Sequence, residues 1–214
     1  MLRSIFNPDN LFFRFTDRVL DLMVLSLLWV VCSLPVVTVG AASAALYYSC
    51  AKCLRHKEGG AYRSFFAAFR QNLRTGSAAT AVFLLLALLL TAGYAVLERL
   101  APDVFRVMYL VLLLLPIAVA CCAFPLLSRF ACTVGGLLAT SLRLTLRHLP
   151  RMLALAALYV AGAALTLRLW YAAVVLLTPA LCALLSTYLL EPVFRHYTPP
   201  EERAAGEEPP WYLR

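Results

Sequence analysis

Uninterrupted apolar runs about twenty residues long constrain this chain more than any other feature. Residues 78–97 and residues 169–190 contain no charged side chain. A helix needs about 20 residues to cross the roughly 30 Å hydrocarbon core of a bilayer, so each run is long enough to span it. The runs therefore predict a membrane protein.

Composition supports this prediction and bounds the number of domains. Of the 214 residues, 63% are hydrophobic and 14% are charged. Soluble domains hold about 45–50% apolar and about 25% charged residues, so a soluble fold this apolar could not cover itself with polar surface. We expect one helical membrane domain over residues 1–197. Residues 198–214, rich in Glu and Pro, are expected to form a disordered cytoplasmic tail.

The predicted fold class is all-α: a polytopic helical membrane protein with five to six transmembrane helices and amphipathic interfacial helices. The expected spans are residues 19–34, 78–97, 104–124, 152–167 and 169–190. The segment from Pro35 to Gly40 interrupts the first apolar region, and a small-residue helix is expected at 41–52. Residues 19–52 therefore form either one long span or a tight pair of shorter spans. Five spans place the N-terminus outside the cell, and six place it inside.

An aromatic stripe follows the basic, glycine-ended loop at residues 52–60. Its members recur at the spacing of one helix face and are Tyr62, Phe65, Phe66, Phe69 and Leu73. Basic residues lie largely off this stripe. The pattern predicts an amphipathic helix lying at the membrane surface, ahead of the span at 78–97.

The distribution of charge predicts the orientation. Connections at 52–74 and 129–151 hold ten Lys or Arg residues and a single acid, Glu58. The turns near 98–106 and 168 hold three basic and two acidic residues. The positive-inside rule therefore places the basic connections and the C-terminus in the cytoplasm. The same placement accounts for the net charge of +8 without a nucleic-acid partner.

Two segments resemble the signature of the YesL family of bacterial integral membrane proteins (domain of unknown function 624). They are Ser-Leu-Pro-Val-Val-Thr-Val-Gly at 33–40, with Ala-Leu-Tyr-Tyr at 45–48, and Phe-Phe-Ala-Ala-Phe-Arg-Gln-Asn at 65–72. The resemblance implies a multi-pass protein of the bacterial plasma membrane. It also implies a link to carbohydrate uptake, with carbohydrate ABC importer subunits as expected partners beside the lipid bilayer. It supplies no catalytic residue and no cofactor.

Three charged residues form a candidate functional cluster where the first span begins. Asp17 and Asp21 are four positions apart and share a helix face, with Arg18 between them. Acids inside a bilayer are costly, by about 2.5–3.5 kcal/mol at its centre, which favours an ion or proton site or a contact with another subunit. An interfacial cluster that pairs with nearby arginines explains the same residues.

The expected helix break at Pro35, Thr38 and Gly40 also has two interpretations. An unwound segment could expose backbone carbonyls to a substrate, as the broken helices of transporters do. A helix-breaking turn at the membrane face explains the sequence equally well.

Several polar residues on the basic connections are candidates for contact with a cytoplasmic partner or with lipid headgroups. Cations beside an anionic leaflet gain about 1 kcal/mol each, and topology alone would also require them. These residues are Arg63, Arg70, Asn72, Arg74, Arg143 and Arg147.

The sequence contains no recognisable enzyme motif, so we expect no catalytic activity, no cofactor and no metal. Cys50 and Cys53 form a C-x-x-C with His56 nearby, but further ligands for a metal site are missing.

We expect a non-enzymatic accessory or regulatory component associated with carbohydrate uptake. The alternative is a small solute transporter or channel that uses the broken helix around Pro35–Gly40. The sequence leaves the oligomeric state open.

Overall fold

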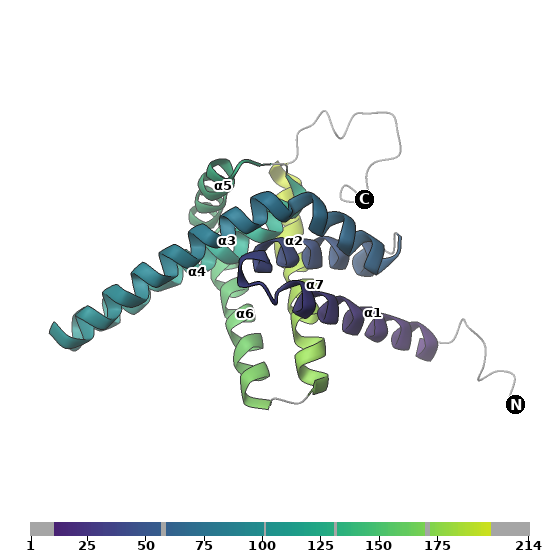
Figure 1. The fold of residues 1–214 in the computed structure, drawn as a ribbon, viewed down its shortest axis with the longest axis horizontal. Helices are drawn as coiled ribbons and strands as arrows, with labels where there is room; N and C mark the ends of the chain where they lie inside the picture. The colour runs from purple at the N-terminus through teal and green to yellow at the C-terminus, as the bar shows by residue number, and fades with distance from the viewer. Residues whose placement is uncertain (1–10, 57–58, 101, 131, 170–171, 198–214) are drawn as a thin grey trace, which may run out of the picture.

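The computed structural model describes residues 11–56, 59–100, 102–130, 132–169 and 172–197, and every regular element in these ranges is a helix (Figure 1). This confirms the predicted all-α class. The elements are α1 (Leu11–Cys32), η2 (Val36–Thr38), α2 (Val39–Ser49), η3 (Cys50–Arg55), α3 (Ala61–Leu100), α4 (Asp103–Arg129), α5 (Val134–Arg147), α6 (Leu149–Leu169) and α7 (Ala172–Tyr197).

Four helices in the described part of the chain are long and apolar enough to cross a membrane. Their apolar segments are Ala61–Glu98 in α3, Asp103–Arg129 in α4, Leu149–Leu169 in α6 and Leu176–Phe194 in α7. The chain is therefore a membrane protein with helical spans. The expected first span, residues 19–34, lies mostly within the 22-residue helix α1. The total of five or six spans stays a prediction.

Helix α3 joins two elements that the sequence suggested were separate. The expected interfacial helix and the expected span at 78–97 form one helix of 40 residues. At 1.5 Å per residue it is about 60 Å long, twice the thickness of a hydrocarbon core. The junction at 73–78 contains Gly76 but no proline, and glycine alone weakens a helix without ending it.

Helix α2 lies at the centre of the fold and contacts α1, α3, α4 and α7. Ala41, Ala42, Ala44 and Ala45 have no exposed surface, and such small side chains let helix backbones approach closely. The crossing with α3 is tight, because a Cβ on Gly76 would lie 2.8 Å from the Ala41 backbone.

The aromatic stripe on α3 divides between the protein interior and the surface. Phe65 is fully buried and stacks on Phe69 at 6.2 Å between ring centroids. Tyr62 and Phe66 remain 59% and 50% exposed. Part of the stripe therefore packs against α1 and α2. The sequence predicted a helix that lies at the membrane surface, and it did not predict this packing.

The second half of α3 and the first half of α4 form a hairpin that projects from the rest of the molecule (Figure 1). Its apolar side chains are largely exposed, Leu88 and Leu89 by 66% and 62%. The two helices touch at Tyr109, whose hydroxyl donates to the Leu90 carbonyl at 2.8 Å. A face this apolar is suited to lipid.

Helices α6 and α7 form a second hairpin, and α1 packs against α7. The Ala180 amide donates to the Ser26 hydroxyl at 3.1 Å, which joins α7 to α1 next to Pro179. The last expected span ended at residue 190, but α7 continues to Tyr197 through Pro192. That extension brings Glu191 into the protein interior.

Candidate functional site

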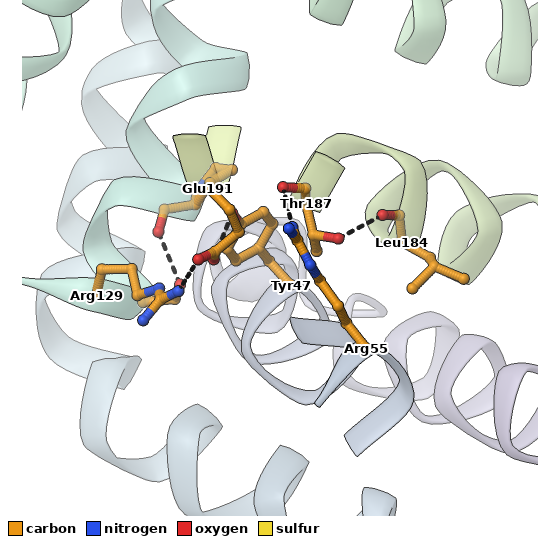
Figure 2. Close-up of polar contacts among 8 residues, drawn as sticks. Tyr47, Arg55, Arg129, Leu184, Thr187 and Glu191 are labelled. Atoms are coloured by element: carbon orange, nitrogen blue, oxygen red, sulfur yellow. Dashed lines mark hydrogen bonds and ion pairs between the residues drawn. The ribbon is translucent and has the colours of Figure 1, made fainter. Parts of the chain in front are cut away.

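A buried charge network connects α2, α4 and α7. Glu191 of α7 is 1% exposed, and its carboxylate forms an ion pair with Arg129, the last residue of α4 (Figure 2). The Arg129 side chain is 6% exposed. The hydroxyl of Tyr47, on α2, donates to the other carboxylate oxygen of Glu191 at 3.2 Å.

This network satisfies charges that would otherwise destabilise the fold. Removing a carboxylate from water costs several kcal/mol, and only a close partner with further hydrogen bonds offsets the cost. Glu191 has both, because Arg129 supplies the charge and Tyr47 the additional donor. The three side chains therefore fix the relative positions of three helices.

A second arginine fastens the same end of α7. Arg55, at the end of η3, donates to the Thr187 carbonyl at 2.7 Å (Figure 2). Its guanidinium also lies 4.8 Å from the centroid of the Tyr188 ring, within the range of a cation–π contact. Thr187 itself donates to the Leu184 carbonyl at 2.7 Å. Arg55 and Arg129 thus hold one region of α7 from two different segments.

The predicted site residues do not include Glu191, Arg129 or Tyr47. A signal was present: Glu191 is the single acid between positions 104 and 200, and apolar residues flank it on both sides. An isolated acid in such surroundings must find a partner if the helix continues. Its partner is 62 positions away, so the pairing itself needs the fold.

A polar cavity of about 390 Å³ lies beside this network. Arg129 forms part of its wall, together with Gln71, Asn72 and Ser128. Asn72 is one of the predicted contact residues, and its amide donates to the Ala68 carbonyl at 3.0 Å. The predicted partner-contact residue therefore faces an indentation of the protein surface.

The acidic cluster on α1 lies apart from the network. Asp17, Arg18 and Asp21 are all exposed on the first half of the helix. The Glu191 network is formed from α2, α4 and α7 without them. Both interpretations of the cluster, an ion site and an interfacial cluster, stay predictions.

The break between α1 and α2 is a short turn followed by the three-residue helix η2. The Thr38 hydroxyl lies 2.6 Å from the Cys32 carbonyl oxygen and 2.7 Å from that of Pro35. The Gly40 amide donates to the Thr80 hydroxyl at 3.0 Å, and Thr80 donates to the Gly76 carbonyl at 2.8 Å. The Gly40–Thr80 contact anchors the break against α3. The hydrogen bonds also occupy the Cys32 and Pro35 carbonyls and the Gly40 amide, which are backbone groups that an unwound substrate site would expose.

The predicted basic contact residues divide into two groups. Arg63, Arg70 and Arg74 are exposed on α3 and recur at i, i+7 and i+11, which places them on one side of the helix. We call this surface the α3 arginine face.

Arg143 and Arg147 belong to a different place, a cavity of about 410 Å³ between α4, α5 and α7. We call it the α5 cavity, and its wall contains Leu126, Phe130, Cys132, Thr140, Arg143, Leu144, Arg147, Phe194 and Tyr197.

The C-x-x-C cysteines lie in η3, a segment of π-helix. The Cys50 thiol is buried and contacts the Ala180 carbonyl at 3.7 Å, and the Cys53 thiol contacts the Ser64 hydroxyl at 3.4 Å. Burial raises the pKa of both thiols, which disfavours the thiolate that redox chemistry uses. Across the described residues, no three His, Cys, Asp or Glu side chains are grouped to hold a metal.

The fold and the site together define a polytopic helical membrane protein whose buried charges serve helix packing. Residues 22–94 match the model of a family described as "Protein of unknown function, DUF624". The match supports assignment of the chain to this family and agrees with the resemblance carried by 33–40 and 65–72. Searches of curated proteins and of solved structures found no match to the chain.

Proposed function

We propose that this protein is a non-enzymatic accessory or regulatory component of the bacterial plasma membrane, associated with carbohydrate uptake. Its basic connections and C-terminus lie in the cytoplasm, and subunits of a carbohydrate ABC importer are its partners. The charge distribution supports the orientation. The resemblance to the YesL family supports the membrane and the link to uptake.

The α3 arginine face is the observation that carries this proposal. Arg63, Arg70 and Arg74 are exposed, while Phe65 and Ala68 on the same helix are buried against the protein. Packing on one side therefore fixes the helix backbone that carries the cations on the other side. A row of cations at fixed backbone positions gives electrostatic complementarity to an acidic protein surface, which favours specific docking.

The buried network supports the non-enzymatic part of the proposal. Glu191 and Arg129 neutralise each other, and Tyr47 donates to the same carboxylate. Groups engaged in this way stabilise the arrangement of helices.

Charge reversal on the α3 arginine face tests the proposal. In the Arg70→Glu, Arg74→Glu variant, recovery of importer subunits with the tagged protein from native membranes is expected to fall at least tenfold. Like charges placed across an interface cost several kcal/mol, and 1.4 kcal/mol corresponds to a factor of ten. Sugar uptake should decline in parallel.

A variant with Arg143→Glu and Arg147→Glu is the matched control, because it reverses two exposed charges on α5 instead. It should keep its importer subunits. The proposal is wrong if the α3 variant inserts normally and retains both its partners and full sugar uptake.

The alternative function, a small solute transporter using the break at Pro35–Gly40, makes a different prediction. Val36 and Val37 are 58% and 48% exposed, so this turn is accessible from outside the protein. A transporter would move some solute into reconstituted vesicles and lose that flux with Asp21→Asn. An accessory protein alone in vesicles would give no flux across a broad panel of solutes.

A further inference from the structure

The geometry points to a binding site for one anionic phospholipid in the α5 cavity. We propose that Arg143 and Arg147 hold the headgroup phosphate and that an acyl chain enters the cavity. The site is separate from the α3 arginine face, so it and the proposed function can fail independently.

The cavity combines the two surfaces that a phospholipid needs. Its inner wall is apolar and includes Leu126, Leu144 and Phe194, all of which are buried. Its rim carries Arg143 and Arg147, both exposed and one helical turn apart on α5. A soluble anion would use the cations and leave the apolar wall wet. An uncharged apolar ligand would leave the cations without a partner.

The cavity lies at the level where a headgroup is expected. It is bounded by the end of α4, by α5 and by the end of α7, and α6 begins immediately after α5. The spans of α4, α6 and α7 therefore all begin or end beside it. Basic pockets between helices on the cytoplasmic side are a recurrent place for anionic headgroups.

Neighbouring side chains hold Arg147 at the rim. Its guanidinium lies 5.9 Å from the centroid of the Tyr197 ring, within cation–π range. The Tyr197 hydroxyl in turn lies 3.3 Å from Nε2 of His148. The cation is thus directed by aromatic contacts and keeps its donors available to a phosphate.

Native mass spectrometry of the full-length protein tests the site. The protein is titrated with phosphatidylglycerol or with phosphatidylcholine in detergent, and bound lipid is counted. Phosphatidylglycerol should bind more tightly, with one molecule per chain at saturation of the strongest site.

The Arg143→Gln, Arg147→Gln variant should weaken phosphatidylglycerol binding roughly 25-fold, since each cation contributes about a factor of five (about 1 kcal/mol). The matched control, Arg63→Gln with Arg70→Gln, removes the same charge from α3 and should bind the lipid as the natural protein does. Equal losses in both variants would show a general charge effect and overturn the proposal.

A second variant tests whether the lipid needs the space of the cavity as well as its two arginines. Thr140 is exposed and forms part of the cavity wall, so Thr140→Trp fills the space while both arginines remain. It should abolish the strongest phosphatidylglycerol site, and unchanged binding would overturn the proposal. A photoreactive group at position 140 should cross-link to lipid in native membranes. Cross-linking to protein instead, another copy of the chain included, would also overturn it.

Discussion

The two halves of α3 have the same secondary structure and opposite surroundings. In the first half, Phe65 is buried, and Gly76 and Thr80 contact α2 directly. In the second half, Leu85 and Leu88 are 58% and 66% exposed. One helix therefore passes from a region filled by protein to a region that lipid must cover.

The two ion pairs of α4 show the same contrast between an exposed region and a packed region. Near its start, Asp103 and Arg106 pair at 3.0 Å with the Asp103 side chain 90% exposed. At its end, Arg129 pairs with Glu191 in the interior. We infer that close packing and buried ion pairs stabilise the packed region, whereas the projecting hairpin depends mainly on the apolar character of its surface. Matched substitutions in the two regions test this interpretation.

The largest contrast is expected between the two ion pairs of α4. Glu191→Gln leaves the Arg129 charge buried without its counter-charge and should lower the free energy of unfolding by about 3–5 kcal/mol. Asp103→Asn should lower it by less than about 1 kcal/mol, as for other exposed pairs. Denaturant unfolding in mixed micelles measures both. Similar losses would remove the distinction between the regions.

A second contrast compares large apolar side chains on α3. Phe65→Ala empties a fully buried site and should cost about 3–5 kcal/mol. Leu88→Ala should cost less than about 0.5 kcal/mol, because lipid is as apolar as the leucine it touches. The same unfolding assay applies, and a costly Leu88→Ala would indicate that another protein surface covers the hairpin.

The smallest contrast compares two glycines of α3. A Cβ at Gly76 would meet the Ala41 backbone at 2.8 Å, which cannot move aside, so Gly76→Ala should cost about 1–3 kcal/mol. A Cβ at Gly93 would meet the Tyr109 hydroxyl at 2.7 Å, the end of a side chain that can move aside at the cost of its hydrogen bond to the Leu90 carbonyl. Gly93→Ala should stay within about 1 kcal/mol of zero, since alanine also favours the helix. Equal thermal unfolding shifts in the two variants would contradict the tight α2–α3 crossing.

Much of the fold could be predicted because apolar runs and helix breakers act locally. The runs at 78–97 and 104–124 lie in α3 and α4, and the interruption at Pro35 lies between α1 and α2. The continuity of α3 was harder to predict. The sequence predicted a surface helix ahead of a separate span at 78–97, but residues 71–77 between them lie on the same helix, which contacts α2 and borders the polar cavity.

The candidate site was less predictable, because its contacts are distant in sequence. Tyr47 and Glu191 are 144 positions apart, and no local pattern relates them. The α5 arginines were identified from the sequence, but the apolar cavity beside them is formed by three helices. The tail at 198–214 lies outside the described residues, so its expected disorder stays a prediction.

The continuity of α3 has a mechanical consequence. Its arginine-bearing half and its lipid-exposed half form one continuous helix of 40 residues, so a change in the tilt of one half is carried to the other. In the proposed function, a partner docked at Arg63 or Arg70 is joined to Leu88 by this unbroken helix. Any tilt of α3 that docking causes is therefore transmitted to the hairpin.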